Sequence, residues 1–251
     1  MMRNLQQRDL RPEIMDQPGV ERRRHEHALR GLARVNALSR IAAGTWRPIG
    51  DLAARRGLRK MSICDLACGG GDVSLGLVRR AQAAGIDARL TGYDLSPTAI
   101  EHARRQAEKE SLPADFVMRD LFAEPPEGPY DVAVCTLFLH HLDDARAVDL
   151  LSLMRRIARR LVVVNDLLRK PLGYAAAQVV CRMISTSDIV RLDGPQSVAA
   201  AFSLDEARRL AESAGLRHAN LRRTWPFRFL LDWEYPAEQS TATGMSDGPA
   251  D

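Results

Sequence analysis

The sequence predicts an α/β fold built on a doubly wound, mostly parallel sheet. Short apolar runs alternate with helical segments from about residue 61 to residue 165, which is the pattern of a parallel sheet. A glycine turn at residues 69–71 follows the first apolar run directly, and a helical segment follows the turn. A strand, a tight glycine turn and a helix in this order form a cradle for a small ligand.

Sequence patterns predict the following helices and strands along the chain. A helix from about residue 20 to 43 and a short helix from 48 to 56 precede the sheet. The core is then expected to contain a strand ending at 66, a helix at 72–84, a strand at 88–94, a helix at 98–110, strands at 115–119 and 131–137, a helix at 143–159 and a strand at 160–165. Ser203 and Glu206 form a capping-box pattern that opens a further helix, and Gly215 ends it. Two strands follow, at 218–225 and 227–233.

Carboxylates end three successive strands of the predicted sheet. Asp65 ends the run that starts at Met61, Asp94 lies 23 residues after Gly71, and Asp120 ends the third run. An acid at about this distance from a glycine loop offers acceptors to ribose hydroxyls. Because open α/β sheets bind ligands beyond the carboxyl ends of their strands, we expect the three acids to share one site.

These motifs resemble class I S-adenosylmethionine-dependent methyltransferases. The resemblance rests on Asp65-Leu-Ala-Cys-Gly-Gly-Gly71, Tyr93-Asp-Leu-Ser-Pro97, Met118-Arg-Asp-Leu121 and Tyr130-Asp-Val-Ala-Val-Cys-Thr136, in order and spacing. It covers about residues 60–166, with weaker support to residue 233. It implies a seven-stranded, Rossmann-like sheet that an antiparallel strand closes and a helical lid covers.

The resemblance also implies roles for individual residues and a division of the chain. S-adenosyl-L-methionine would be the cofactor and S-adenosyl-L-homocysteine the product. The cofactor contacts that it implies are Asp65, Ala67, Gly69, Gly71, Asp94, Leu95, Asp120, Leu121 and Thr136. Of these, Asp94 would bind the ribose, Asp120 the adenine amino group, and Leu95 and Leu121 the adenine faces. The expected parts are a helical cap (1–58), the core (59–167), a lid insert (168–202), a completing helix and strands (203–235) and a disordered tail (236–251).

Ala67 departs from the family pattern, which has glycine at this position. The backbone there is expected either to have a negative φ or to tolerate a methyl group. A dinucleotide-binding fold is the competing interpretation, but the third glycine of its motif would fall on Ser74. Asp65 also favours a ligand that carries an ammonium and a sulfonium over one that carries a pyrophosphate.

Composition limits the cellular context. The chain has 251 residues, a net charge of +4 and 45% apolar residues, which suits a globular enzyme with a full core. No apolar run is long enough to span a membrane and no signal segment is visible, so a cytoplasmic location is expected. The four cysteines form no Cys-x-x-Cys pair. The sequence therefore predicts neither disulfides nor a metal site.

The arginine-rich stretch 21–30 has two interpretations. Leu29, Leu32, Val35, Leu38 and Ile41 recur at helical spacing, which places the arginines on the solvated face of an amphipathic helix. A contact with an acidic ligand or RNA is the alternative.

The segment after the fourth strand carries the catalytic candidates. In this topology the loop beyond Thr136 lies beside the sulfonium, and it contains His140 and His141. Either imidazole can accept a proton from a hydroxyl as the methyl group moves, although a histidine that merely orders the loop is an equal alternative. In-line transfer depends mainly on alignment of the reactants.

The acceptor is argued by exclusion and by resemblance. The Asn-Pro-Pro-Tyr type motif of amino-group methylation is absent after the fourth strand, and Cys135 lies inside a strand, so DNA is excluded and RNA is not favoured. The apolar lid candidates are Met15, Trp46, Tyr174, Met183, Ile184, Ile189, Phe202, Trp225, Phe227 and Phe229. They suit a flat or lipophilic small molecule. The pattern also resembles quinone and polyketide-phenol methyltransferases, which implies O-methylation of a phenol with Arg191 steering the phenolate.

Three questions stay open at the level of sequence. An RNA methyltransferase that uses the arginine-rich face and a non-catalytic cofactor-binding regulator are the alternative functions. Whether oxygen, carbon or nitrogen receives the methyl group is not fixed by these motifs. The chain is expected to be a monomer or a homodimer.

Overall fold

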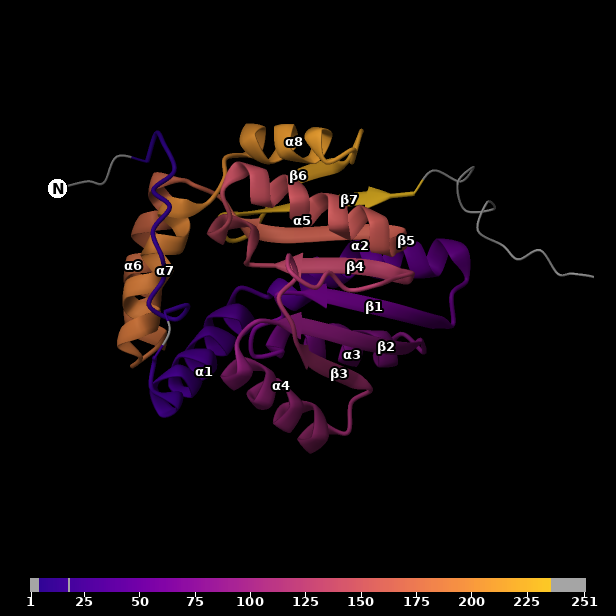
Figure 1. Cartoon of the computed structure of the whole chain (residues 1–251), viewed down its shortest axis with the longest axis horizontal. Helices are drawn as coiled ribbons and strands as arrows, with labels where there is room; N and C mark the ends of the chain where they lie inside the picture. Colours follow the sequence, from indigo (N-terminus) through magenta and orange to yellow (C-terminus); the bar gives the residue numbers. More distant parts are fainter. Residues whose placement is uncertain (1–4, 18, 236–251) are drawn as a thin grey trace, which may run out of the picture.

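The computed structural model describes residues 5–17 and 19–235, and these form a sheet of seven strands flanked by helices (Figure 1). The strand order is β3-β2-β1-β4-β5-β7-β6. The strands are β1 (Lys60–Leu66), β2 (Asp87–Asp94), β3 (Ala114–Met118), β4 (Tyr130–Thr136), β5 (Ala158–Leu167), β6 (Asn220–Thr224) and β7 (Arg228–Glu234). The first five are parallel, and β7 runs antiparallel between β5 and β6. The predicted doubly wound, mostly parallel sheet with an antiparallel closure is confirmed.

Helices cover both faces of the sheet. One face packs against α2 (Ile41–Arg56), α3 (Asp72–Ala83) and α4 (Pro97–Glu110), and the other against α5 (Asp144–Ile157) and α8 (Leu204–Ser213). Each layer has its own hydrophobic core, because the inner strands are apolar on both sides. This double cover leaves the carboxyl edge of the sheet as the place for a site.

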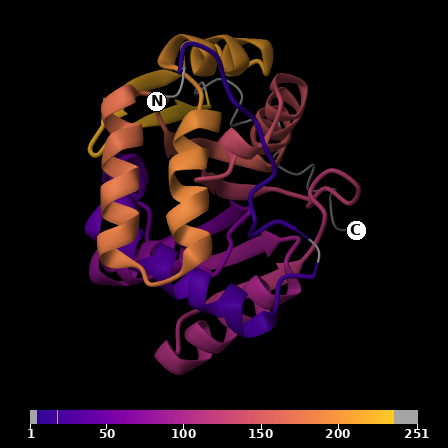
Figure 2. The same cartoon turned by 90° about the vertical axis from the view of Figure 1, so that its left-hand side faces the viewer.

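Three helices stand beyond that carboxyl edge. They are α1 (Arg22–Leu38), α6 (Pro171–Ile184) and α7 (Asp188–Ala200) (Figure 1). Helices α6 and α7 contact each other and lie side by side in Figure 2. Ala28, Cys181, Ile189 and Val190 form a small separate core among them. The short 3₁₀ helix η1 (Leu139–His141) contacts α7. The loop that carries both histidines therefore lies between the sheet and this helical layer.

The N-terminal helix prediction was wrong in one respect. The expected single helix over 20–43 is broken, because Arg40 adopts a left-handed conformation (φ 52°) and α2 begins at Ile41. Pro48, which suggested a helix start, lies inside α2. The break at Ser39 is tied to the sheet, since the buried guanidinium of Arg228 donates to Ser39 Oγ at 2.7 Å. This contact reaches across 189 residues, and no local pattern reveals it.

Other expectations are confirmed. Ser203 and Glu206 form a reciprocal capping box at the start of α8, and β6 and β7 form the hairpin around Pro226. All four cysteines are buried free thiols. In the stretches 5–17 and 19–235, no helix has the length and apolarity to cross a bilayer. The expected disordered tail, 236–251, lies outside the described residues.

Candidate active site at the carboxyl edge of the sheet

The tips of β1 and β2 are joined by the carboxylate of Asp94. Its Oδ2 accepts a hydrogen bond from the backbone N–H of Gly69 at 2.8 Å, and its Oδ1 accepts one from the N–H of Ser96 at 2.9 Å. Burial raises the pKa of Asp94 and outweighs these two bonds. Each carboxylate oxygen has a second lone pair for a further donor. The structure therefore brings the predicted ribose acceptor against the glycine loop.

Three residues of the glycine loop have a left-handed backbone, and their surroundings differ. Gly69 has φ 54°, and a Cβ added there would meet no atom within 4 Å, so the backbone borders open space. Gly71 has φ 78°, and a Cβ there would lie 2.8 Å from the Cβ of Ala103, so packing against α4 requires glycine. Ala67 has φ 59°. The negative φ that was one alternative for Ala67 is therefore wrong, and the left-handed backbone carries a methyl group at a cost of about 1–2 kcal/mol.

Asp65 is a buried carboxylate, and only one of its two oxygens accepts a hydrogen bond from a described residue. The residue has no exposed surface, and its Oδ2 accepts a hydrogen bond from Ser74 Oγ at 2.5 Å. Its Oδ1 is buried and has no hydrogen-bond partner among the described residues. Burial raises the pKa of Asp65 to about 7, with the nearby charges of Asp72 and Asp94 acting in the same direction. An unpartnered buried carboxylate oxygen is costly and calls for a donor.

The third strand tip is more open. Asp120 Oδ1 accepts from the N–H groups of Phe122 and Ala123, and these bonds lower the pKa of Asp120. Leu95 is 67% exposed and is free to pack against a ligand. Leu121 is 6% exposed and packs in the core beneath α5. Only a small part of its side chain is therefore available for the expected contact with adenine. Thr136 is buried at the end of β4.

Helix α1 covers the glycine loop with its apolar face. Leu29 Cδ2 would lie 3.3 Å from a Cβ at Gly70, and Asn36 Nδ2 donates to Asp72 Oδ2 at 3.0 Å. His25 is also buried on this face, where burial lowers its pKa. Helix α1 therefore covers the glycine loop, which the sequence patterns did not predict.

The arginines of α1 lie on its other face, where acidic residues of neighbouring helices pair with them. Arg22 bonds Glu101 at 2.6 Å, and Arg24 bonds Asp188 at 2.5 Å. Arg105 of α4 bonds Glu26 at 2.7 Å. This arrangement is that of the solvated, ion-paired face.

His140 is held by a buried carboxylate at the tip of β5. Its Nδ1 lies 2.6 Å from Asp166 Oδ1, and its backbone N–H donates to Asp166 Oδ2 at 3.2 Å. Burial would raise the pKa of Asp166, but the neighbouring His140 keeps it low. An ionised carboxylate can only accept, so Nδ1 of His140 carries a proton, and in the neutral imidazole Nε2 presents a lone pair. This is the orientation of a general base.

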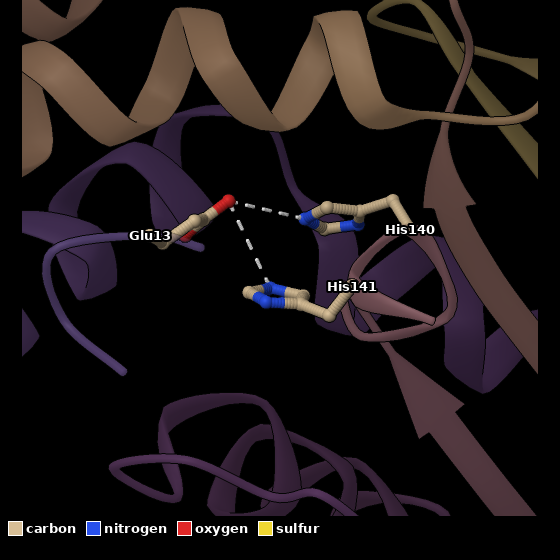
Figure 3. Close-up of side chains that lie close together, drawn as sticks. All are labelled: Glu13, His140 and His141. Atoms are coloured by element: carbon tan, nitrogen blue, oxygen red, sulfur yellow. Dashed lines mark ion pairs between the residues drawn. The ribbon is translucent and has the colours of Figure 1, made fainter. Parts of the chain in front are cut away.

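His141 has the same arrangement with a different acid. Its Nδ1 lies 2.9 Å from Asp16 Oδ2, and the two imidazole rings are 4.4 Å apart between centroids. Burial alone would lower the pKa of His141, but the hydrogen bond to Asp16 and the charges of Glu13 and Asp16 raise it to about 9. Glu13 faces both rings (Figure 3). The histidine pair therefore sits in an acidic surrounding.

An N-terminal segment, residues 5–17, brings these acids to the histidines. Arg8 Nη2 donates to the carbonyl oxygens of His140 and Leu142 at 3.1 and 2.8 Å. The backbone N–H groups of Ile14 and Met15 donate to the Asp193 carboxylate at 3.0 and 3.1 Å. The segment thus runs between the histidine loop and α7 and lies against both (Figure 2).

Arg191 does not join the histidine pair. Its Nε donates to the carbonyl oxygen of Ser185 at 2.8 Å, and its Nη2 lies 3.4 Å from the carbonyl oxygen of Arg182. These carbonyls belong to the end of α6, so the guanidinium caps that helix. The expectation that Arg191 steers a phenolate has no support in its position.

The apolar lid candidates separate into two groups. Ile189, Phe202 and Phe229 are at most 1% exposed and belong to the protein core. Met183 and Trp225 are 81% and 70% exposed and point outward. Only a part of the predicted apolar lining therefore remains available to an acceptor.

Comparison with known proteins decides the family of the core. Residues 63–160 match the family model described as a methyltransferase domain. These residues belong to the methyltransferase-domain family. The domain contains Asp65, Asp94, Asp120 and both histidines, whereas Glu13 and Asp166 lie outside the matched residues.

Several curated relatives are methyltransferases named for ubiquinone biosynthesis or for demethylmenaquinone. A ubiquinone biosynthesis O-methyltransferase from Xanthomonas campestris is 30% identical over 142 residues, which is 53% of this chain and 54% of the relative. A demethylmenaquinone methyltransferase from Thermus thermophilus is 34% identical over 117 residues, 46% of this chain and 50% of the relative. The chain spans about half the length of the curated relatives that it matches.

A solved structure confirms the fold over a longer range. Magnesium protoporphyrin IX methyltransferase from Synechocystis, with S-adenosylhomocysteine bound, has a TM-score of 0.55 and 17% identity, and the match covers 80% of this chain and 87% of that one. The Rossmann-like architecture of the methyltransferase domain thus extends over most of the chain.

Sequence reasoning missed Glu13, Asp16 and Asp166. Asp166 has a visible signal, since it is an acid at the end of a strand like the three acids that were identified. The other two lie 125 or more residues before His141 in the sequence, and no periodic pattern links them to it.

Proposed function

We propose that this chain is an S-adenosylmethionine-dependent methyltransferase that methylates a small, flat or lipophilic acceptor, with O-methylation of a phenol, quinol or polyketide as its reaction. The observation that carries this proposal is the pairing of two half-sites on one sheet edge. One is the glycine loop with its unpartnered buried carboxylate, and the other is an imidazole that a second carboxylate holds in the orientation of a base. The curated relatives add the quinone-type acceptor.

The residues of the cradle fit the cofactor. The vacant Oδ1 of Asp65 suits the ammonium group of the methionine part, because a buried carboxylate is best satisfied by a cation that donates hydrogen bonds. Open space at Gly69 allows close approach to the backbone. Asp94 would accept from the ribose hydroxyls, while Asp120 and Leu95 would contact the adenine. When bound, S-adenosylmethionine supplies a methyl group already activated by the sulfonium.

The acceptor side supplies proton transfer and alignment. With its Nδ1–H held by Asp166, His140 would take the proton of the acceptor hydroxyl at Nε2. Asp166 prevents the ring from turning and stabilises the imidazolium that forms, as the acid does in a catalytic triad. His141 and Glu13 border the same space. In this proposal the helical cap and residues 168–202 form the lid that excludes water from the reacting groups.

Location and assembly belong to the proposal as well. Four free buried thiols favour a reducing compartment, so we propose that the enzyme works in the cytoplasm. The arginines of α1 pair with acids, which favours a small acceptor over RNA.

The test is methyl transfer to a panel of phenols, quinols and polyketide products, read by mass spectrometry as a gain of one methylene. His140→Asn is the decisive variant, because the amide can still donate to Asp166 but has no group at the position of Nε2. Its turnover number should fall by about 10²-fold or more while its affinity for S-adenosylhomocysteine is unchanged.

His218→Asn is the matched control. His218 is exposed at the amino-terminal end of β6, at the opposite edge of the sheet, and its φ of 61° is one that asparagine tolerates. Its turnover should equal that of the wild-type protein. Equal turnover in both variants would remove His140 from the mechanism. A protein that binds the cofactor but methylates no member of the panel would favour the non-catalytic alternative.

A further inference from the structure

Three potential metal ligands converge in front of the histidine loop (Figure 3). Glu13 Oε1 lies 3.8 Å from His140 Nε2 and 3.9 Å from His141 Nε2. The donor atoms of all three residues lie within 4.8 Å of one another. Ser197 Oγ lies 2.5 Å from the same Glu13 oxygen and orients the carboxylate. The cluster joins the N-terminal segment to the loop after β4.

The outer partners of the two histidines are those of metal ligands. Each Nδ1 faces a carboxylate, Asp166 for His140 and Asp16 for His141. A carboxylate at the far nitrogen of a metal-binding imidazole fixes its tautomer and raises its basicity. With Nδ1 of each ring on its carboxylate, both Nε2 atoms face the same oxygen of Glu13. A metal ion that displaces the proton of His141 would bind all three atoms at once.

The charge balance around the cluster points the same way. The carboxylates of Glu13, Asp16 and Asp166 belong to it, and Asp193 holds the segment that carries the first two. The guanidinium of Arg8 bonds the carbonyls behind the histidines, and Arg228 acts on Asp166 from within the core. These four carboxylates outnumber the two guanidinium groups, so the surroundings of the cluster favour a cation, which is a proton on His141 without metal and a divalent ion when metal is bound.

We propose that Glu13, His140 and His141 bind a divalent transition-metal ion, with zinc as the best fit. Two imidazoles and one carboxylate are the ligand set of zinc sites that keep one position open. Metal–ligand bonds of about 2.0–2.1 Å at tetrahedral angles require ligand atoms about 3.4 Å apart. The observed 3.8 and 3.9 Å need a contraction of a few tenths of an ångström. The sequence, which has no cysteine pair, predicted no such site.

The consequence for catalysis rests on the proposed function, although metal binding itself does not. In the metal-loaded protein, Nε2 of His140 is a ligand and no longer a base. An acceptor hydroxyl at the open position would lose its proton to water as it binds, because a bound divalent cation lowers the pKa of that hydroxyl. The ion would also align the oxygen beside the glycine loop.

The test is metal binding by the full-length protein after treatment with a chelator and gel filtration. We expect one equivalent of Zn²⁺ by calorimetry and a visible Co²⁺ spectrum of tetrahedral type. Glu13→Gln and His141→Ala should each weaken Zn²⁺ binding by at least about 100-fold, because loss of a direct ligand should cost no less than the roughly 10–100-fold typical for loss of an outer partner. His27→Ala is the matched control, because His27 bonds Thr186 away from the cluster, and it should bind as the wild type does.

The outcomes separate the two proposals. Zn²⁺ binding that is absent, or equal in Glu13→Gln, His141→Ala and His27→Ala, overturns the metal site. If His141→Ala fails to fold, Glu13→Gln decides alone, because it changes one atom on a surface segment. Wild-type protein that methylates a phenol equally well in the presence of chelator also overturns the metal role but leaves the methyltransferase intact. Protein that binds one Zn²⁺ yet transfers no methyl group overturns only the proposed function.

Discussion

Replacement of Asp65 by asparagine separates the effect of the buried carboxylate on folding stability from its effect on cofactor binding. The wild-type carboxylate is fully buried, and only its Oδ2 has a partner, Ser74 Oγ. Asparagine keeps the shape and accepts the same hydrogen bond through its Oδ1, but it carries no charge. The variant should therefore be more stable than the wild type without ligand and should bind the cofactor less tightly.

The magnitude follows from the pKa of Asp65. The carboxyl group has a pKa of about 7 in the folded protein and its ordinary pKa of 3.8 in the unfolded chain. The unfolded chain therefore releases the proton first, and wild-type stability falls as the pH rises from about 4 to 7. A difference of about 3 pKa units corresponds to roughly 4 kcal/mol, which is an upper estimate for the gain of Asp65→Asn at pH 8. At pH 4 the gain should vanish.

The assay is urea unfolding at pH 4, 6 and 8 without ligand, with calorimetric titration of S-adenosylhomocysteine at pH 8. Asp87→Asn, at an exposed position at the start of β2, is the control. We expect Asp65→Asn to lose about 10–100-fold in affinity, the value of a hydrogen bond to a charged group. Wild-type affinity should also fall below pH 7, because Asp65 must ionise to hold an ammonium. Unchanged affinity in Asp65→Asn would refute the contact between Asp65 and the ammonium group. Unchanged stability of this variant at pH 8 would refute the conclusion that the buried carboxylate destabilises the fold.

Four further substitutions test the glycine loop and the carboxylate that bonds it. Ala67→Gly should raise the free energy of unfolding by up to about 1 kcal/mol in urea titrations, because it relieves an alanine at positive φ, and lower stability would contradict this. Gly69→Ala should weaken S-adenosylhomocysteine binding in calorimetry and should lower the melting temperature only by the strain of an alanine at positive φ, about 1–2 kcal/mol. Gly71→Ala carries the same strain and should lower the melting temperature by several degrees more, since its Cβ would also meet Ala103. Equal melting temperatures of the two variants would refute the distinction. Asp94→Ala should reduce cofactor affinity by at least about 10-fold, and unchanged affinity would exclude the ribose contact.

The sequence was sufficient for the local parts of the site. A carboxylate at each strand end and a glycine turn are short-range signals, and parallel pairing brings them to one edge. Asp65, Gly69 and Asp94 therefore lie together as predicted, and Asp94 bonds the loop itself. The capping box at Ser203 was readable for the same reason, since both of its partners lie within one turn.

Long-range contacts determine the features that the sequence did not predict. The break between α1 and α2 carries no glycine or proline, and it is held by Arg228 from β7. Glu13 reaches the histidines through an N-terminal segment without regular structure. Arg191 was assigned by its charge, but helix packing turned it toward the end of α6. Charge and distance in the sequence did not reveal these three positions, because tertiary packing fixes them.

The most direct measurement is a crystal structure of this protein with S-adenosylhomocysteine. We expect the ligand ammonium within hydrogen-bond distance of Asp65 Oδ1, the ribose hydroxyls against Asp94 and the sulfur on the side of His140. A ligand bound elsewhere, or bound at this edge with Asp65 Oδ1 still unpartnered, would contradict the proposed cofactor site.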